Sequence, residues 1–155
     1  MINSLRRNLV SKAVLALDLF LWLWWLAVML RIYAIPMLLE RIAGKRKEAE
    51  SPIDVDAVVG LVTHVCNLRP FRSRIFPKLC LRQSLALYRT LIKMGYPIEI
   101  HFGVRKDENN LTGHCWVTME GKPVADTAYS ATFKVLYSYS RCRDFDTSQN
   151  ERIPS

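Results

Sequence analysis

Hydrophobic residues form an almost unbroken run near the N-terminus of the chain. From Ala13 to Leu30 the one polar residue is Asp18, which predicts a long apolar helix. A membrane-spanning helix needs about 20 apolar residues, and Asp18 and Arg31 leave this run short. No small-x-small cleavage site of a secretory signal precedes Arg31. We therefore expect a core or partner-binding helix, with membrane association through residues 13–30 as the alternative.

The next hydrophobic segment is divided by Pro36 and ends at Gly44, and the charged stretch Lys45–Glu50 is typical of a linker. This pattern predicts two parts. Residues 1–50 form an apolar helical segment with its linker, and residues 51–155 form the remaining domain. We expect the two to pack as one unit, because 155 residues is the size of a single domain.

A helix is predicted where valines recur at helical spacing after Ser51. Ser51 is a favourable N-cap, Pro52 suits the first helical position, and Asp54 can complete a capping box. The valine pattern continues to Val65, so the helix is expected to end at about Asn67.

A second helix is predicted from Leu79-Cys80 to Gly95, where glycine suits the position just after a helix end. Beyond Gly95 the hydrophobic period changes to two, which indicates strands separated by a polar turn at 107–110 and a hairpin turn at Glu120-Gly121. The strands are expected at Pro97–Val104, His114–Met119 and Lys122–Thr127. N-terminal helices followed by a small antiparallel sheet predict an α+β fold.

The charge and cysteine content of the chain indicate which class of partner it binds and in which cellular compartment it works. The net charge of +8 is scattered in small groups, and no segment alternates basic with aromatic residues as a single-strand binder would. We therefore expect an acidic peptide as partner and no nucleic acid. None of the four cysteines is in a CxxC pair, and no metal-ligand spacing joins them to the histidines. The expected setting is the reducing cytoplasm, with free thiols and no metal or other cofactor.

Three residues in the C-terminal half combine into a possible catalytic site: Cys80, His114 and Asp126. Cys80 lies where the second helix begins, and unpaired N–H groups there favour a nucleophilic thiolate and can stabilise an oxyanion. His114 begins a strand, and Asp126 lies in the next one, where a carboxylate can orient the imidazole. Cysteine, histidine and carboxylate in this order are typical of thiol acyl transfer.

The hairpin between His114 and Asp126 must have a particular register for this triad. A two-residue turn at Glu120-Gly121 pairs Cys115 with Asp126, which places Asp126 on the face opposite His114. A three-residue turn pairs Trp116 with Asp126 and makes Asp126 a diagonal neighbour of His114, about 7 Å away. We therefore predict the longer turn or a bulge.

Several ordered motifs between Leu79 and Thr127 give the chain a family resemblance. They are Cys80-Leu81, Ser84-Leu85-Ala86-Leu87, Gly95, Gly103-Val104-Arg105, His114-Cys115-Trp116-Val117, Gly121 and Val124-Ala125-Asp126-Thr127. In this order they resemble the lasso peptide biosynthesis B2 proteins, leader peptidases of the transglutaminase-like cysteine protease superfamily. Cys115 departs from the family, which typically has alanine there.

The resemblance implies a papain/transglutaminase-like core with Cys80 as nucleophile, His114 as general base and then acid, and Asp126 as the orienting carboxylate. It implies as substrate a precursor peptide made of leader and core. It also implies two partners, a stand-alone leader-recognition protein and an ATP-dependent lasso cyclase that receives the freed core. A fused recognition domain before the helices is not expected.

Two other functions use the same features. A transglutaminase-type acyltransferase would employ the same triad and give an amine-linked product. A non-catalytic, membrane-associated binding scaffold would depend on Trp22, Trp24 and Trp25 instead of the triad.

Overall fold

The computed structural model describes residues 2–44, 54–73, 76, 78–107, 110–125 and 132–140. Helices come first: α1 (Ile2–Ile32), α2 (Ile35–Ala43), α3 (Val55–Cys66), the short 3₁₀ helix η1 (Arg69–Arg72) and α4 (Leu79–Lys93). Four strands follow: β1 (Ile98–Asp107), β2 (Asn110–Met119), β3 (Lys122–Pro123) and β4 (Lys134–Ser140). The expected α+β fold, with helices preceding a small antiparallel sheet, is confirmed.

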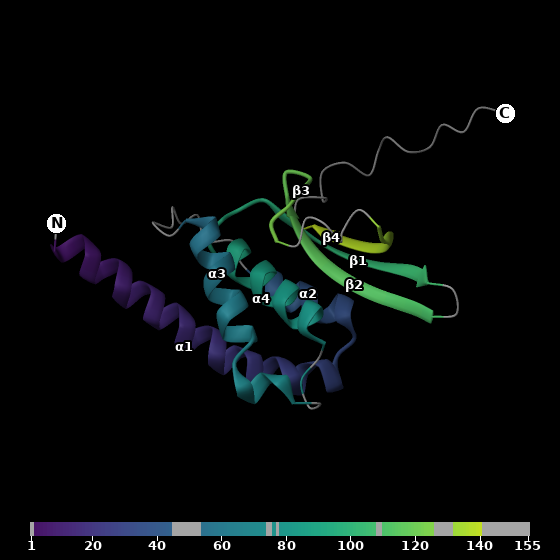
Figure 1. The fold of residues 1–155 in the computed structure, drawn as a ribbon, viewed down its shortest axis with the longest axis horizontal. Coiled ribbons are helices and arrows are strands. Elements are labelled where there is room, and N and C mark those ends of the chain that lie inside the picture. Colours follow the sequence, from purple (N-terminus) through teal and green to yellow (C-terminus); the bar gives the residue numbers. More distant parts are fainter. Residues whose placement is uncertain are drawn as a thin grey trace.

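Helix α4 is the centre of the fold (Figure 1). It packs on β1 and β2 with one side and against α1, α2 and α3 with the others. Its residues Leu85, Tyr88 and Leu91 are fully buried. The helix stops as predicted at Gly95, whose φ of +86° suits glycine. The N–H of Gly95 donates to the carbonyl of Ile92, and a second hydrogen bond links the next residue to the last turn, which completes a Schellman motif.

Helix α1 is longer than its apolar run, and one of its sides belongs to the core. Leu19, Leu23 and Leu26 are at most 1% exposed. The polar exception in the run, Asp18, pairs with Arg89 of α4 through two hydrogen bonds of 2.5 and 3.1 Å. One side of the apolar segment is therefore part of the core, and its acidic residue is paired with Arg89 at the margin of that core, where the Asp18 side chain is 45% exposed.

The start of α3 differs from the prediction. Asp54 is extended (φ −63°, ψ 146°), so it occupies the N-cap position and the helix begins at Val55 instead of Pro52. Ser51 and Pro52, to which the capping motif was assigned, lie outside the described residues. The other end agrees with the valine pattern, since α3 ends at Cys66 with Asn67 as its C-cap.

The sheet is antiparallel with the order β3-β2-β1-β4. Its turn between β2 and β3 contradicts the prediction, because Met119 pairs with Lys122 across a two-residue turn. Glu120 and Gly121 both have positive φ (52° and 76°), as in a type I′ turn, whose twist matches that of the strands it joins. The predicted three-residue turn is therefore wrong, and the expected pairing of Trp116 with Asp126 involves a residue outside the described ranges.

Strand β3 is also shorter than predicted, and β4 was not predicted. The β3 ladder covers only Lys122 and Pro123, and its continuation is one hydrogen bond from the N–H of Val124 to the carbonyl of Val117 (2.9 Å). Proline is tolerated here because β3 is an edge strand. Asp126 and the rest of the predicted strand lie outside the described residues.

Candidate active site

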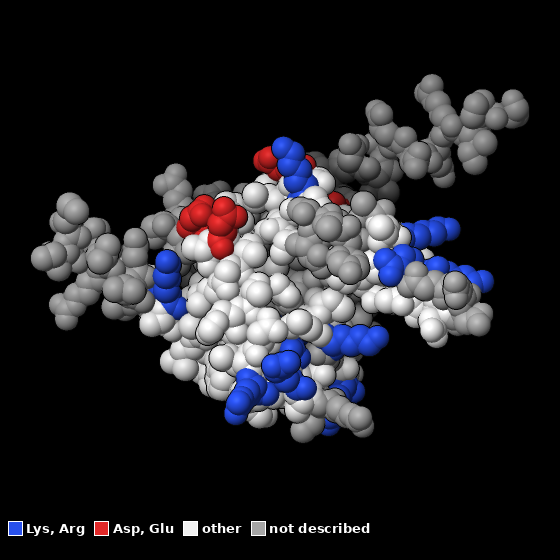
Figure 2. Space-filling view, viewed as in Figure 1, with Lys and Arg blue, Asp and Glu red and all other residues white. Residues whose placement is uncertain are grey.

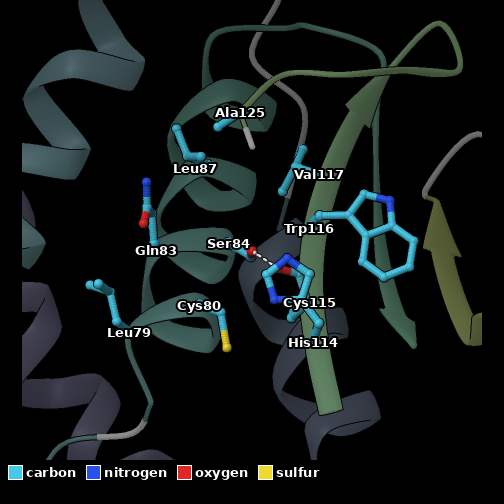
Figure 3. Close-up of a pocket in the computed structure, with 10 residues that line it drawn as sticks. All are labelled: Leu79, Cys80, Gln83, Ser84, Leu87, His114, Cys115, Trp116, Val117 and Ala125. Atoms are coloured by element: carbon cyan, nitrogen blue, oxygen red, sulfur yellow. Dashed lines mark hydrogen bonds between the residues drawn. The ribbon is translucent and has the colours of Figure 1, made fainter. Parts of the chain in front are cut away.

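Cys80 is the second residue of α4, and the structure places it in the first turn, as the sequence predicted. Lys78 is extended (ψ 146°), and the first hydrogen bond of the helix runs from the N–H of Arg82 to the carbonyl of Lys78. The N–H groups before Arg82, including that of Cys80, therefore have no acceptor within the helix. Figure 3 shows the half-buried thiol of Cys80 pointing into a pocket between α4 and β2.

His114 lies within β2, four residues after the strand begins at Asn110, so the prediction that it begins the strand is wrong. It is opposite Gly103 of β1 and borders the same pocket. Its ring stacks on Trp116 (centroids 5.9 Å apart, 18° between planes) and contacts Phe133 (5.0 Å). A Cβ at Gly103 would come within 2.9 Å of the Trp116 indole, so glycine leaves the space that this indole needs beside His114. The aromatic neighbours hold the imidazole in a defined place.

Cys80 and His114 lie between two cavities and line both. The smaller cavity, about 130 Å³, is partly polar and includes Gln83 and Ser84. The larger, about 420 Å³, has an almost entirely apolar lining. Its other lining residues come from five elements (α2, α4, β1, β2 and β4) and the loop before α4: Ile35, Lys78, Leu81, Phe102, Gly103, Val104, Gly113, Cys115 and Leu136. The structure thus brings two of the three predicted site residues to one place, with space on both sides.

Two polar side chains of α4 fix its first turns against the neighbouring elements. The hydroxyl of Ser84 donates to the carbonyl of Cys115 on β2 (2.7 Å, Figure 3). Gln83 donates from its side-chain amide to Thr63 of α3 (2.8 Å). These bonds set the position of Cys80 relative to β2. Ser84 was not among the predicted site residues, although its position four residues after Cys80 places both on the same helix face.

Asp126 lies outside the described residues, so its predicted role stays a prediction. The residue before it, Ala125, lines the smaller cavity together with Cys80 and His114. The β3 ladder ends at Pro123, and the described residues continue only to Ala125.

The other described cysteines differ from Cys80 in burial. Cys66 and Cys115 are free thiols in the core. Burial raises the pKa of Cys66 to about 11 and that of Cys115 to about 12. Both thiols are therefore protonated at neutral pH, which makes them poor nucleophiles.

This difference predicts selective alkylation. At pH 7.5 iodoacetamide should modify Cys80 at least about 100-fold faster than Cys66 or Cys115, because it is partly exposed and they are neutral and buried. Peptide mass spectrometry at timed intervals measures the three rates. Alkylation of Cys66 or Cys115 in the folded protein at the rate of Cys80 would contradict this assignment.

The remaining described histidines have other surroundings. Both ring nitrogens of His101 form 2.8 Å hydrogen bonds, one with Ser138 and one with Thr118. His64 is exposed on α3. Neither lines the cavities beside Cys80, so His114 is the histidine that shares these cavities with the thiol.

Comparison with known protein families gives the wider context. Residues 13–138 match the family model described as the transglutaminase-like superfamily. The chain belongs to the transglutaminase-like superfamily. The search of curated proteins and that of solved structures returned no significant match. The transglutaminase-like match runs from within α1 to within β4, so it includes the N-terminal helix as well as the elements that carry Cys80 and His114.

Proposed function

We propose that this transglutaminase-like protein is a cysteine peptidase that cleaves the leader from a lasso peptide precursor. Its partners in this proposal are a separate leader-recognition protein and a lasso cyclase. The observation that carries the peptidase reaction is the placing of Cys80, at the start of α4, in the same two cavities as His114. Membership of the superfamily and the ordered motifs from Cys80 to Thr127 support the substrate class.

The proposed reaction has two halves. In the first, the Cys80 sulfur attacks the carbonyl carbon of the scissile bond, and the thiol proton passes to His114. N–H groups of the first turn of α4 stabilise the oxyanion. His114 then protonates the departing amine, so the core peptide leaves and the leader stays bound as a thioester.

In the second half, His114 removes a proton from water, and the hydroxide adds to the thioester carbonyl. The C–S bond breaks, the thiol regains its proton, and the leader leaves as a carboxylate. Asp126 is assigned the role of orienting the imidazole.

The larger cavity is proposed to hold an apolar side chain of the precursor next to the scissile bond. Leu136 on β4 lines it and is 65% exposed, so its substitution should not unfold the protein. Leu136→Asp should raise KM by about tenfold, because an apolar contact is lost, with little change in kcat. Steady-state cleavage kinetics measure both constants. An unchanged KM would remove Leu136 from the substrate site.

The proposal is tested by reconstitution. A candidate precursor peptide is incubated with the protein and a recognition partner, and mass spectrometry identifies the products. Free leader with a C-terminal carboxylate, together with core peptide, is the expected result. A leader joined to an added amine would instead establish the transglutaminase-type acyltransferase. Neither product, with a folded protein and a bound precursor, would favour the non-catalytic scaffold.

A further inference from the structure

Helix α1 has two apolar sides, and only one of them is packed in the core. The other consists of residues three, four or seven positions apart, which places them on one line along the helix. We call these residues the outer stripe: Val14, Leu17, Leu21, Trp24, Trp25, Val28 and Ile32. Each is between 40% and 63% exposed. A helix that is apolar on all sides normally has every side covered, so the outer stripe indicates an apolar partner.

Basic residues lie along one edge of the outer stripe. The ring of Trp24 contacts Phe71 of η1 and Phe76 after it (centroids 6.2 and 5.1 Å apart), so η1 lies beside the stripe. Arg69 and Arg72 of η1 are exposed, as is Arg31 in the last turn of α1.

The surface charge is also unevenly distributed. In Figure 2, a group of Lys and Arg side chains lies over the region where Figure 1 places the C-terminal half of α1, and a second group lies at the right-hand edge of the view. Asp and Glu side chains lie at the opposite end of this face. An apolar line bordered by cations and containing two exposed tryptophans matches the depth profile of an anionic lipid surface, with its acyl chains, interfacial zone and headgroups.

We propose that α1 docks the protein side-on to an anionic lipid bilayer through the outer stripe. By length and composition Ser11–Ile32 is sufficient to cross a membrane, so the expectation that Asp18 and Arg31 leave this run too short is wrong. Crossing would remove Leu19, Leu23 and Leu26 from the core and separate Asp18 from Arg89. A helix lying in the interface keeps these contacts and buries the outer stripe.

This docking would also bring the cavities beside Cys80 close to the membrane surface. Ile35, three residues beyond the end of α1, lines the larger cavity. A protein held by α1 therefore has this cavity close to the bilayer, and a precursor would be cleaved at the membrane surface. The docking itself does not depend on the peptidase reaction, so each can fail separately.

The test is flotation of the purified full chain with vesicles of phosphatidylcholine containing about 30% phosphatidylglycerol. The triple variant Leu17→Gln, Leu21→Gln, Val28→Gln should bind at least about 30-fold more weakly, because three apolar side chains lose their lipid contact. In the double variant Arg69→Gln, Arg72→Gln, the affinity for these vesicles should fall about fivefold per residue, and vesicle binding should become less sensitive to salt. Leu111→Gln, at a 72% exposed position on β2, is the matched control and should bind like the wild type.

The depth of spin labels in the bilayer distinguishes a helix α1 that lies in the interface from one that crosses the membrane. A nitroxide is attached at Val14→Cys or Leu21→Cys in a chain whose Cys80 and Cys142 are replaced by alanine, because Leu21 would lie at the bilayer midplane if Ser11–Ile32 crossed. Both labels should report the same shallow depth. Different depths at the two positions would show that α1 crosses the bilayer and would overturn the proposal. The proposal would also be overturned if the triple variant floated with the vesicles as well as the wild type does, or if the wild type did not float with them. A third outcome would assign the outer stripe to a protein partner. In that outcome the wild type does not bind lipid, and the triple variant loses self-association or binding to the recognition protein.

Discussion

Cys80→Ala should lower kcat/KM for leader cleavage by at least about 10⁴-fold while the protein stays folded. The reason is that alanine removes the atom proposed to form the thioester and leaves the helix start unchanged. His114→Ala should give a loss of similar size, because neither the thiol nor the leaving amine would then have its proton carrier. Cleavage assays with precursor and recognition partner, followed by mass spectrometry, measure the loss.

Cys66→Ala is the matched control for Cys80→Ala. It removes a thiol of the same chain that is buried in the core and lines neither cavity. Its cleavage rate should be within about twofold of the wild type at a temperature where it is folded. If the Cys80→Ala protein, with an intact far-UV spectrum, cleaved at the wild-type rate, Cys80 would not be the nucleophile.

Phe71→Ala should cost about 3–5 kcal/mol of unfolding free energy. Phe71 is fully buried, and its ring contacts those of Phe20, Trp24 and Phe76 at centroid distances of 5.1, 6.2 and 5.0 Å. It therefore joins α1 to the loop that leads into α4, and alanine would leave a cavity between them. Phe71→Leu should cost less, because it fills more of the space. Urea unfolding followed by circular dichroism measures both values.

Leu111→Ala provides the comparison for this loss. It deletes apolar atoms at a position that is 72% exposed, so its effect should be within about 0.5 kcal/mol. A cost for Phe71→Ala as small as that of Leu111→Ala would mean that the aromatic cluster does not join α1 to the domain.

Local signals in the sequence predicted the parts of the fold that carry the candidate site. Glycine after the second helix predicted its end at Gly95, and the change of period after it predicted β1 and β2. The start of α4 put Cys80 in the first turn. Each of these depends on residues adjacent along the chain, so no tertiary contact was needed to find them.

Features decided by tertiary contacts were missed or wrong. The predicted three-residue turn at Glu120-Gly121 is wrong, because Glu120 adopts a positive φ that residues of its type rarely have and the two residues form a two-residue turn. Strand β4, which pairs with the edge of β1 opposite β2, was not predicted because its apolar residues do not alternate with polar ones. Val135 and Leu136 are both exposed, and the buried Phe133 precedes the strand. The sequence could not show which side of α1 is covered, because its apolar residues surround the helix and the choice is made by packing on α3 and α4.

The central claim is that Cys80 accepts the leader as a thioester, with His114 moving the protons. It is tested most directly by quenching a single turnover of the reconstituted reaction in acid and mapping the trapped protein by mass spectrometry. The account predicts the leader attached through its C-terminal carbonyl to Cys80, and no attachment in Cys80→Ala. Attachment of the leader to another residue would contradict this claim. So would cleavage without any protein-bound leader, provided that a reference thioester survives the acid quench.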